Sequence, residues 1–360
     1  MLGGENTPTG PTLALVGATG RFARAVTQVL AMRADCWGEV RLLSDRPSAT
    51  TLTVRGREQN VETLTPAAFA GVDVALFNLD EHASRHWAPI AVAAGAVVID
   101  ASSGHRYADD VPLVVPEVNA AAIKDRPRGI VAIPGPVGLT LIDAAFTLHQ
   151  GWDLAGLVVT ALVAAASPGQ RGVDRLRLET TALVDDPTIG QQAGDVRAAL
   201  ADLPTDSPFP APLAFNVIPW VGDPREGGWT SLEDKLAIET RKVLDLPDLS
   251  MAVTCVQVPV TSTHSLSVHA TFRRRVKVEQ AQSAIIQAPA MVLLNDAQGR
   301  EFPTPVDAVG VDPRFVGRVR QASDQANTLD LFICADSLRR GANALVQTAE
   351  LLFTEGDSAV

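Results

Sequence analysis

The 360-residue sequence contains only three cysteines, and they lie far apart in the chain. Cys36, Cys255 and Cys334 form no Cys-x-x-Cys pair, and an odd number cannot be fully paired within one chain. A disulfide framework of the kind found in small secreted proteins is therefore excluded. We expect buried free thiols in a reducing, cytoplasmic environment.

Long hydrophobic runs are also missing. The longest, Ala91–Ile99 and Leu157–Ala166, fall well short of the roughly 20 apolar residues that a membrane-spanning helix needs. The first eleven residues are polar and rich in Gly and Pro, and they lack the basic start and apolar core of a signal peptide. We predict a cytoplasmic protein without membrane association.

Positive charge is in deficit. Lys and Arg number 30 against 41 Asp and Glu, so the formal net charge is −11. Such a field repels phosphate backbones, which argues against nucleic-acid binding. The basic run at 273–275 is too short to reverse this and fits a solvated or dimer-edge feature. His82 and His86 share a helical spacing but have no third ligand nearby, so no metal site is predicted.

Alternating strands and helices dominate the N-terminal part of the sequence. Apolar strand patterns recur at 12–16, 40–43, 72–76, 96–100 and 130–133, with helical spacing at 22–32 and 87–94. This predicts an α/β fold with a Rossmann-type parallel sheet. Beyond Pro134 the strand patterns at 154–166, 253–260, 266–272 and 290–294 predict a mixed, mainly antiparallel sheet. Helices are expected at 174–184, 232–243 and 337–353.

A glycine-rich loop joins the first strand to the first helix. Its glycines allow backbone N–H groups to approach phosphate oxygens at the start of a helix, which is typical of dinucleotide binding. The candidate cofactor-binding residues in this loop are Gly17, Ala18, Thr19, Gly20, Arg21 and Phe22. A second group follows the second strand and consists of Ser44, Asp45, Arg46 and Ser48. Ser44 and Arg46 favour the 2′-phosphate of NADP, whereas Asp45 would favour NAD, so we predict NADP as the cofactor.

Several ordered motifs resemble the aspartate-semialdehyde dehydrogenase family over nearly the whole chain. They are the loop at 17–20, Val-Val-Ile-Asp-Ala-Ser-Ser at 97–103, Val-Pro-Leu-Val-Val-Pro-Glu-Val-Asn at 111–119, Ala-Phe-Asn-Val-Ile-Pro at 214–219, Glu-Thr-Arg-Lys at 239–242 and Asp-Ser-Leu-Arg-Arg-Gly-Ala at 336–342. The resemblance implies a Rossmann domain at 1–134, a dimerisation and substrate domain at 135–330, and a C-terminal helix at 331–360 that returns to the Rossmann domain. It also implies a homodimer.

The family reaction is the reversible reductive dephosphorylation of an acyl phosphate through a cysteine thioester. By resemblance, His264 falls on the general acid/base and Arg106 on the phosphate-binding arginine. Lys235 falls on a lysine of the substrate pocket, and Gln347 resembles a glutamine that contacts the cofactor.

Four positions depart from the family pattern. Pro136 stands where the nucleophilic cysteine belongs. Gln257 replaces an arginine that pairs with the substrate carboxylate, so a bidentate contact is lost. Val163 falls on a glutamine that supports the reacting centre, and Leu232 falls on a glutamate.

We therefore predict a catalytically degenerate, NADP-binding paralogue of unknown ligand, similar to the cysteine-lacking branch called USG-like. The alternative is an active oxidoreductase that uses His264 and Arg106 for hydride transfer without a thioester. A third interpretation, a dehydrogenase with a shifted nucleophile, needs a replacement group. Thr140 and Ser167 lack an activating base in sequence, and strand alternation places Cys255 in the core.

Overall fold

The computed structural model describes residues 10–33, 36–46, 50–296 and 298–354, so Ser48 lies outside the described residues. The chain divides into two compact units. Unit 1 comprises Met1–Gly135, Lys242–Asp245 and Leu338–Val360, and unit 2 comprises Pro136–Arg241 and Leu246–Ser337. Each unit is described by itself below.

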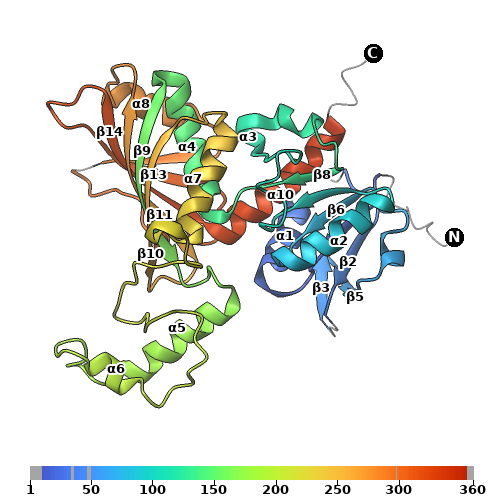
Figure 1. Cartoon of the computed structure of the whole chain (residues 1–360), viewed down its shortest axis with the longest axis horizontal. Helices are drawn as coiled ribbons and strands as arrows, with labels where there is room; N and C mark the ends of the chain where they lie inside the picture. Colours follow the sequence, from blue (N-terminus) through green and yellow to red (C-terminus); the bar gives the residue numbers. More distant parts are fainter. Residues whose placement is uncertain (1–9, 34–35, 47–49, 297, 355–360) are drawn as a thin grey trace. The chain divides into compact units, whose positions relative to one another are not determined.

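Unit 1 is an α/β unit (Figure 1). Its elements are β1 (Leu13–Val16), α1 (Gly20–Met32), β2 (Val40–Ser44), β3 (Thr51–Val54), β4 (Arg57–Asn60), β5 (Glu62–Thr63), η1 (Pro66–Phe69), β6 (Val74–Phe77), α2 (Glu81–Ala93), β7 (Val97–Asp100), α3 (Pro116–Asn119), η2 (Ala120–Lys124), β8 (Ile130–Ala132) and most of α10 (Ser337–Thr354).

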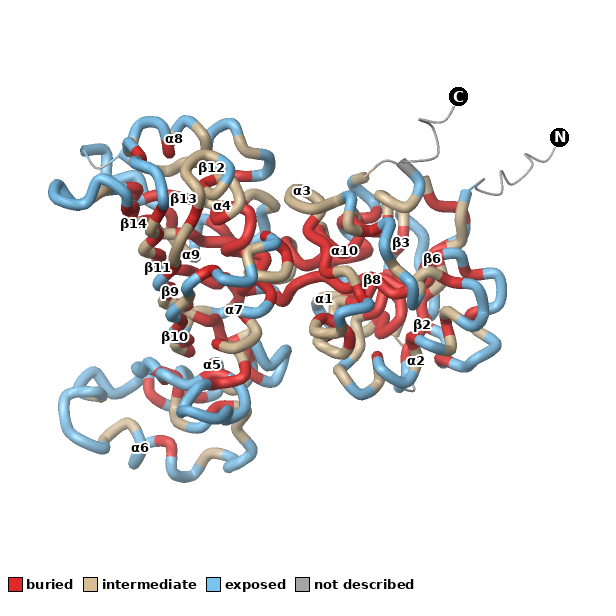
Figure 2. Tube along the Cα trace, turned by 45° about the horizontal axis from the view of Figure 1, so that its top comes forward, coloured by how far each residue is buried: buried red, intermediate tan, exposed pale blue. Residues whose placement is uncertain are grey.

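The main sheet of unit 1 has six strands in the order β5-β2-β1-β6-β7-β8, and every pairing is parallel. Every residue of β1, β6 and β8 is buried (Figure 2). Strands covered on both faces are expected to be continuously apolar, which explains why short Val/Leu/Ala runs form them. The predicted parallel sheet is confirmed. The antiparallel β3–β4 pair was not predicted.

Unit 2 contains a second six-stranded sheet. Its elements are α4 (Pro136–Trp152), β9 (Leu154–Ala164), α5 (Gln170–Leu183), α6 (Asp195–Ala199), η3 (Glu226–Gly228), most of α7 (Ser231–Leu244), β10 (Ser250–Val258), β11 (Thr263–Phe272), α8 (Val278–Gln287), β12 (Met291–Leu294), α9 (Pro305–Ala308), β13 (Arg314–Arg320) and β14 (Thr328–Asp336).

The strand order of this sheet is β10-β9-β11-β14-β13-β12. The three central pairings are antiparallel, and the two outer ones, β10 with β9 and β13 with β12, are parallel. The predicted mixed, mainly antiparallel sheet is confirmed. Helix α4 packs on β9, β11 and β14, and α8 packs on α4, β12 and β13.

A buried ion pair joins helix α4 to the start of strand β13. Arg314 is fully buried and donates to the Asp143 carboxylate, whose side chain is also buried. The guanidinium Nη1 additionally donates to the carbonyl of Ala290 at 2.9 Å. An ion pair removed from water in this way tolerates the loss of neither partner alone.

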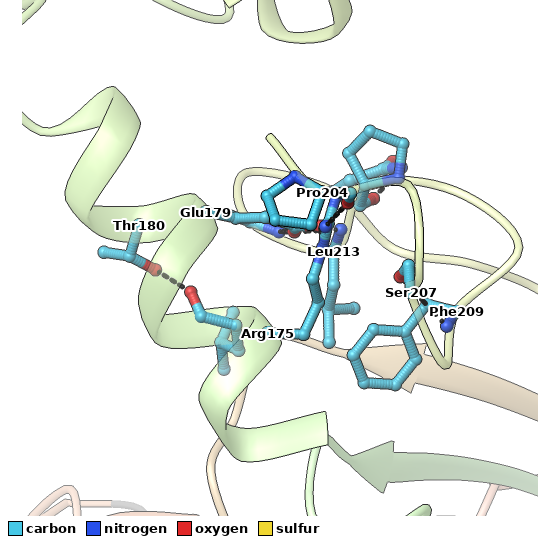
Figure 3. Close-up of polar contacts among 11 residues, drawn as sticks. Arg175, Glu179, Thr180, Pro204, Ser207, Phe209 and Leu213 are labelled. Carbon is cyan, nitrogen blue, oxygen red and sulfur yellow. Dashed lines mark hydrogen bonds and ion pairs between the residues drawn. The ribbon is translucent and has the colours of Figure 1, made fainter. Parts of the chain in front are cut away.

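Helices α5 and α6 and the loop that follows them form a lobe with its own small core beyond the edge strand β10 (Figure 1). Glu179 of α5 is fully buried and accepts hydrogen bonds from the amides of Leu213 (2.7 Å) and Ala214 (3.0 Å). Its other oxygen accepts from Nε of Arg175 at 2.6 Å, and Arg175 also donates to the carbonyl of Pro204 (Figure 3). One carboxylate thus fixes the loop 204–214 against α5.

The cysteines of the structure are free thiols, as predicted. Cys255 and Cys334 are fully buried, whereas Cys36 is half-buried. In the described part of the chain, none of the helices combines the length and apolar character of a transmembrane span. The same residues contain no group of three or more His, Cys, Asp or Glu side chains placed to hold a metal ion.

Candidate functional site

The glycine loop of unit 1 lies at the carboxyl end of β1. Gly17 has a φ of +83°, and an added Cβ would lie 2.1 Å from the carbonyl oxygen of Asn78, so only glycine fits this position. The amides of Gly17 and Ala18 both donate to the carbonyl of Leu43, and the amide of Thr19 donates back to Gly17. The first three residues of the loop therefore shape it, and their amides already have acceptors.

The first turn of α1 is better placed to receive a phosphate. Thr19 occupies the N-cap position without making a side-chain capping bond, and the first amides of any helix have no carbonyl one turn earlier. An added Cβ at Gly20 would meet no atom within 4 Å, so space is open beside these amides. Gly20, Arg21 and Phe22 carry the amides that remain for an anion.

Three other predicted cofactor residues of unit 1 suit a polar ligand. Side-chain Oε1 of Gln347, on α10, is shielded from solvent and has no hydrogen-bond partner among the described residues. Ser44 is buried at the end of β2, and its Oγ accepts from the amide of Arg46 at 3.1 Å. The side chain of Arg46 is exposed. The hydrogen bond between Ser44 Oγ and the amide of Arg46 closes a turn, and the exposed side chain of Arg46 extends from this turn.

The side chain of Arg106 is held by main-chain carbonyls of two other residues of unit 1. The side chain is 7 % exposed, Nε donates to the carbonyl of Ile133 at 2.8 Å, and Nη2 donates to that of Ala101. These bonds commit two of its nitrogens to the ends of neighbouring strands. The Arg106 side chain is thereby fixed in orientation at the carboxyl edge of the parallel sheet.

Lys242 fixes the loop that carries Arg106. Its Nζ donates to the carbonyls of Arg106 (3.0 Å), Ala108 (2.7 Å) and Val111 (2.9 Å). Burial lowers the pKa of this lysine, and the nearby Asp109 and Asp110 oppose the shift. The motif containing Lys242 was recognised in the sequence, but its role was not, because the three acceptors lie 131 to 136 residues away.

In unit 2, Pro136 is the first residue of α4 and is exposed. Proline suits this position, because its fixed φ matches the helix and its missing N–H would have no intrahelical partner. The hydroxyl of Thr140 donates to the carbonyl of Pro136 at 2.9 Å, one turn back. This hydroxyl is buried and its hydrogen bond stays within the helix.

His264 is buried on β11 with a defined tautomer. Its Nδ1 accepts a hydrogen bond from the amide of Ala164 at 3.1 Å, so the proton of the neutral ring lies on Nε2. Burial lowers the pKa of His264 to about 4, against a smaller opposing effect of Asp336. The imidazole is therefore neutral at pH 7 and presents an N–H donor at Nε2.

This depressed pKa makes stability depend on pH. Between about pH 6.5 and 4 the unfolded chain protonates His264 and the folded chain does not, so stability falls as pH falls. We expect the imidazole to lower the free energy of unfolding by about 2–3 kcal/mol between pH 7 and 4.5. Urea unfolding at both pH values should show a smaller loss in His264→Gln than in the wild type. Equal losses would contradict this assignment.

Gln257 of β10 is anchored to the same strand end as His264. Its Nε2 donates to the carbonyls of Val163 (2.8 Å) and Ala164 (2.7 Å), and the side chain is 3 % exposed. The structure thus anchors two of the predicted site residues, Gln257 and His264, to the last residues of strand β9. Val163 contributes only its carbonyl, since its side chain is fully buried.

Unit 2 contains a cavity of about 530 Å³ beside Gln257. Lys235 of α7 lines it, so two of the predicted substrate residues share one cavity. The rest of the wall includes the polar residues Ser167, Asp223 and Ser231 and the apolar residues Phe209 and Trp220. The residues missed by sequence reasoning are Asp223 and Ser231. Asp223 lies in a Gly/Pro-rich loop that indicated only a turn, and Ser231 is the first residue of α7.

Two family models match the chain. Residues 12–126 match the semialdehyde dehydrogenase NAD binding domain, and residues 146–340 match the semialdehyde dehydrogenase dimerisation domain. The chain belongs to the aspartate-semialdehyde dehydrogenase family. The aspartate-semialdehyde dehydrogenase of Streptomyces akiyoshiensis is 38 % identical over 345 residues, covering 95 % of this chain and 98 % of its own. That of Aquifex aeolicus is 34 % identical over 352 residues, covering 96 % and 99 %.

Solved structures of the family superpose closely. Aspartate semialdehyde dehydrogenase II of Vibrio cholerae has a TM-score of 0.88 at 32 % identity, covering 97 % of this chain and 100 % of its own. A second structure of that protein, described as complexed with ASA, gives the same TM-score and identity over 97 % and 99 %. Family membership therefore extends over both units.

Proposed function

We propose that this family member binds NADP but has no semialdehyde dehydrogenase activity, as expected of the cysteine-lacking, USG-like branch. The observation that carries the proposal is Pro136 at the exposed first position of α4. A cysteine at a helix N-terminus is activated, because the helix dipole favours the thiolate. Proline offers no nucleophile, so no thioester can form.

The existing cysteines of unit 2 cannot take over. Burial raises the pKa of the Cys255 thiol to about 12 and that of Cys334 to about 11. Cys334 also shares a hydrogen bond with Ser265 at 3.1 Å, within the sheet. Neither thiol ionises near neutral pH, and neither is accessible to a substrate. Without a thiolate, the covalent route is closed.

Cofactor binding is supported by unit 1. The uncapped first turn of α1 offers amides to a pyrophosphate, and the exposed Arg46 offers charge to a 2′-phosphate. The unpartnered Oε1 of Gln347 offers an acceptor to an amide N–H. When bound, NADP would supply hydride chemistry, but the residues of this chain account only for its binding. The match to a dimerisation domain supports a homodimer.

Direct hydride transfer through His264 and Arg106 is the weaker candidate. The His264 ring, with a pKa of about 4, cannot deliver a proton from the imidazolium at neutral pH. Arg106 already donates to two main-chain carbonyls. The imidazolium that would deliver the proton is therefore scarce at neutral pH, and two of the Arg106 nitrogens are already bound to the main chain.

The test is an assay with aspartate semialdehyde, phosphate and NADP, beside a titration of NADPH by nicotinamide fluorescence. The Aquifex aeolicus relative serves as the reference enzyme. We expect saturable NADPH binding without turnover. If the wild-type protein turns over the substrate and His264→Ala does not, the proposal that activity has been lost is refuted. If NADPH does not bind at millimolar concentration, the proposal of a retained cofactor site is refuted.

Replacing Pro136 by cysteine should not restore the enzyme. We expect the new thiol, exposed at the helix N-terminus, to react rapidly with iodoacetamide, which shows that it is accessible and ionised. Turnover should stay on the order of 10³-fold below the reference enzyme, because Gln257 and Val163 also depart from the family site. Full rescue by this single change would show that those departures matter little.

A further inference from the structure

The cavity of unit 2 has an unusual residue in its wall. Only 3 % of the surface of Gln257 is exposed, yet this residue lines the open space of the cavity. Both hydrogens of its amide nitrogen are directed to main-chain carbonyls, of Val163 at 2.8 Å and of Ala164 at 2.7 Å. Turning the amide over would place its oxygen against two carbonyl oxygens, so only one orientation is possible.

This orientation leaves Oε1 as the polar atom that Gln257 offers to the cavity. The oxygen accepts no hydrogen bond from the described residues. A carbonyl-type oxygen accepts hydrogen bonds and cannot donate them. A ligand group placed against it must therefore carry an N–H or O–H, and a carboxylate in that position would be repelled.

Lys235 requires the opposite kind of ligand group, an anion that accepts hydrogen bonds. Lys235 lines the same cavity, and its ammonium group forms no ion pair among the described residues. An ammonium donates three hydrogen bonds and attracts an anion. Asp223 also lines the space but lies on an exposed loop, where solvent screens its charge.

We propose that this cavity binds a small monoanion with a hydrogen-bond donor at its other end, and that it rejects dicarboxylates. The anionic group contacts Lys235, and the donor contacts Oε1 of Gln257. The inference deepens the proposed function, since it takes this cavity as the ligand site. It also makes Gln257 a specificity-determining residue, and not simply the remnant of a lost arginine.

Three compounds of nearly equal size test the requirement in the wild-type protein. Succinamate is a monoanion with an amide donor, monomethyl succinate is a monoanion without a donor, and succinate is a dianion. Isothermal titration at pH 7.5 should show succinamate binding about tenfold more tightly than either of the others. Tighter or equal binding of succinate, or equal binding of the methyl ester, would overturn the proposal.

Two variants assign the contacts. Gln257→Arg should reverse the preference, so that succinate binds more tightly than succinamate. Lys235→Met should weaken all three compounds at least tenfold, whereas Lys277→Met, at an exposed lysine of the same unit, should leave them unchanged. If Gln257→Arg fails to fold, the comparison of succinamate with its ester still decides the question.

Cofactor binding is measured separately, in unit 1. NADPH titration therefore tests the proposed function independently of this cavity. If NADPH binds normally but succinamate does not bind at about 10 mM, the inference about the cavity is rejected and the proposed cofactor binding is not. Succinamate binding without NADPH binding would reject the cofactor proposal and leave the inference standing.

Discussion

Replacing Arg314 by methionine is expected to lower the free energy of unfolding by about 3–5 kcal/mol. The change removes the guanidinium that pairs with Asp143 and leaves that carboxylate buried at 4 % side-chain exposure. It also removes the donor to the carbonyl of Ala290. Urea unfolding followed by tryptophan fluorescence should show the loss as a lower midpoint with an unchanged slope.

Two controls separate charge burial from packing. The double variant Asp143→Leu with Arg314→Met should recover most of the lost stability, because an apolar pair has no desolvation cost to offset. Arg171→Met removes the exposed pair with Asp206 and should change stability by less than about 1 kcal/mol. If the buried and exposed variants lose similar amounts, the ion pair does not stabilise α4 against β13.

Replacing Glu179 by alanine should lower the free energy of unfolding by about 3–5 kcal/mol and weaken ligand binding in the cavity of unit 2. The amides of Leu213 and Ala214 would lose their acceptor, and Arg175 would lose its buried anion (Figure 3). The freed loop carries Phe209, which lines the cavity. Thermal unfolding and succinamate titration of the same variant measure both effects.

Two nearby variants sharpen this test. Glu179→Gln keeps the shape but leaves a single acceptor oxygen, so it should lose less stability than Glu179→Ala. Thr180→Val removes a hydroxyl that bonds to the carbonyl of Leu176 within α5, and it should affect neither the loop nor the cavity. A loss in Thr180→Val as large as that in Glu179→Ala would mean that the helix, and not the carboxylate, holds the loop.

Strands β1, β2, β6, β7 and β8 of unit 1 could be predicted because each is a short, mainly apolar run between turn residues. Helix α4 could not, and the sequence analysis expected no helix at this place. The sequence around its first residue, Pro-Gly-Pro-Val-Gly at 134–138, indicates a turn, and every residue from Val137 to Ala145 is buried. A helix buried on all sides has no polar face, so the periodicity that reveals surface helices is absent. Strands β13 and β14 were likewise not predicted.

The sequence shows which residues are candidates for the site, but it does not show their protonation states or the directions of their hydrogen bonds. The tautomer of His264 depends on the amide of Ala164, which lies 100 residues earlier in the chain. The direction of the Gln257 amide depends on two carbonyls 93 and 94 residues earlier. Such contacts are set by the pairing of β9 with β10 and β11, which no local pattern encodes.

The common anchoring of Gln257 and His264 has a consequence for how this protein can change over evolutionary time. Both side chains are hydrogen-bonded to Ala164 of β9, and Gln257 also to Val163, so a shift of one position in that strand would disturb them together. Selection for a new ligand therefore acts more easily on the identity of residue 257 than on the course of the backbone beneath it. New ligand specificities in this lineage should arise by substitution of single side chains, while the backbone that carries them stays unchanged.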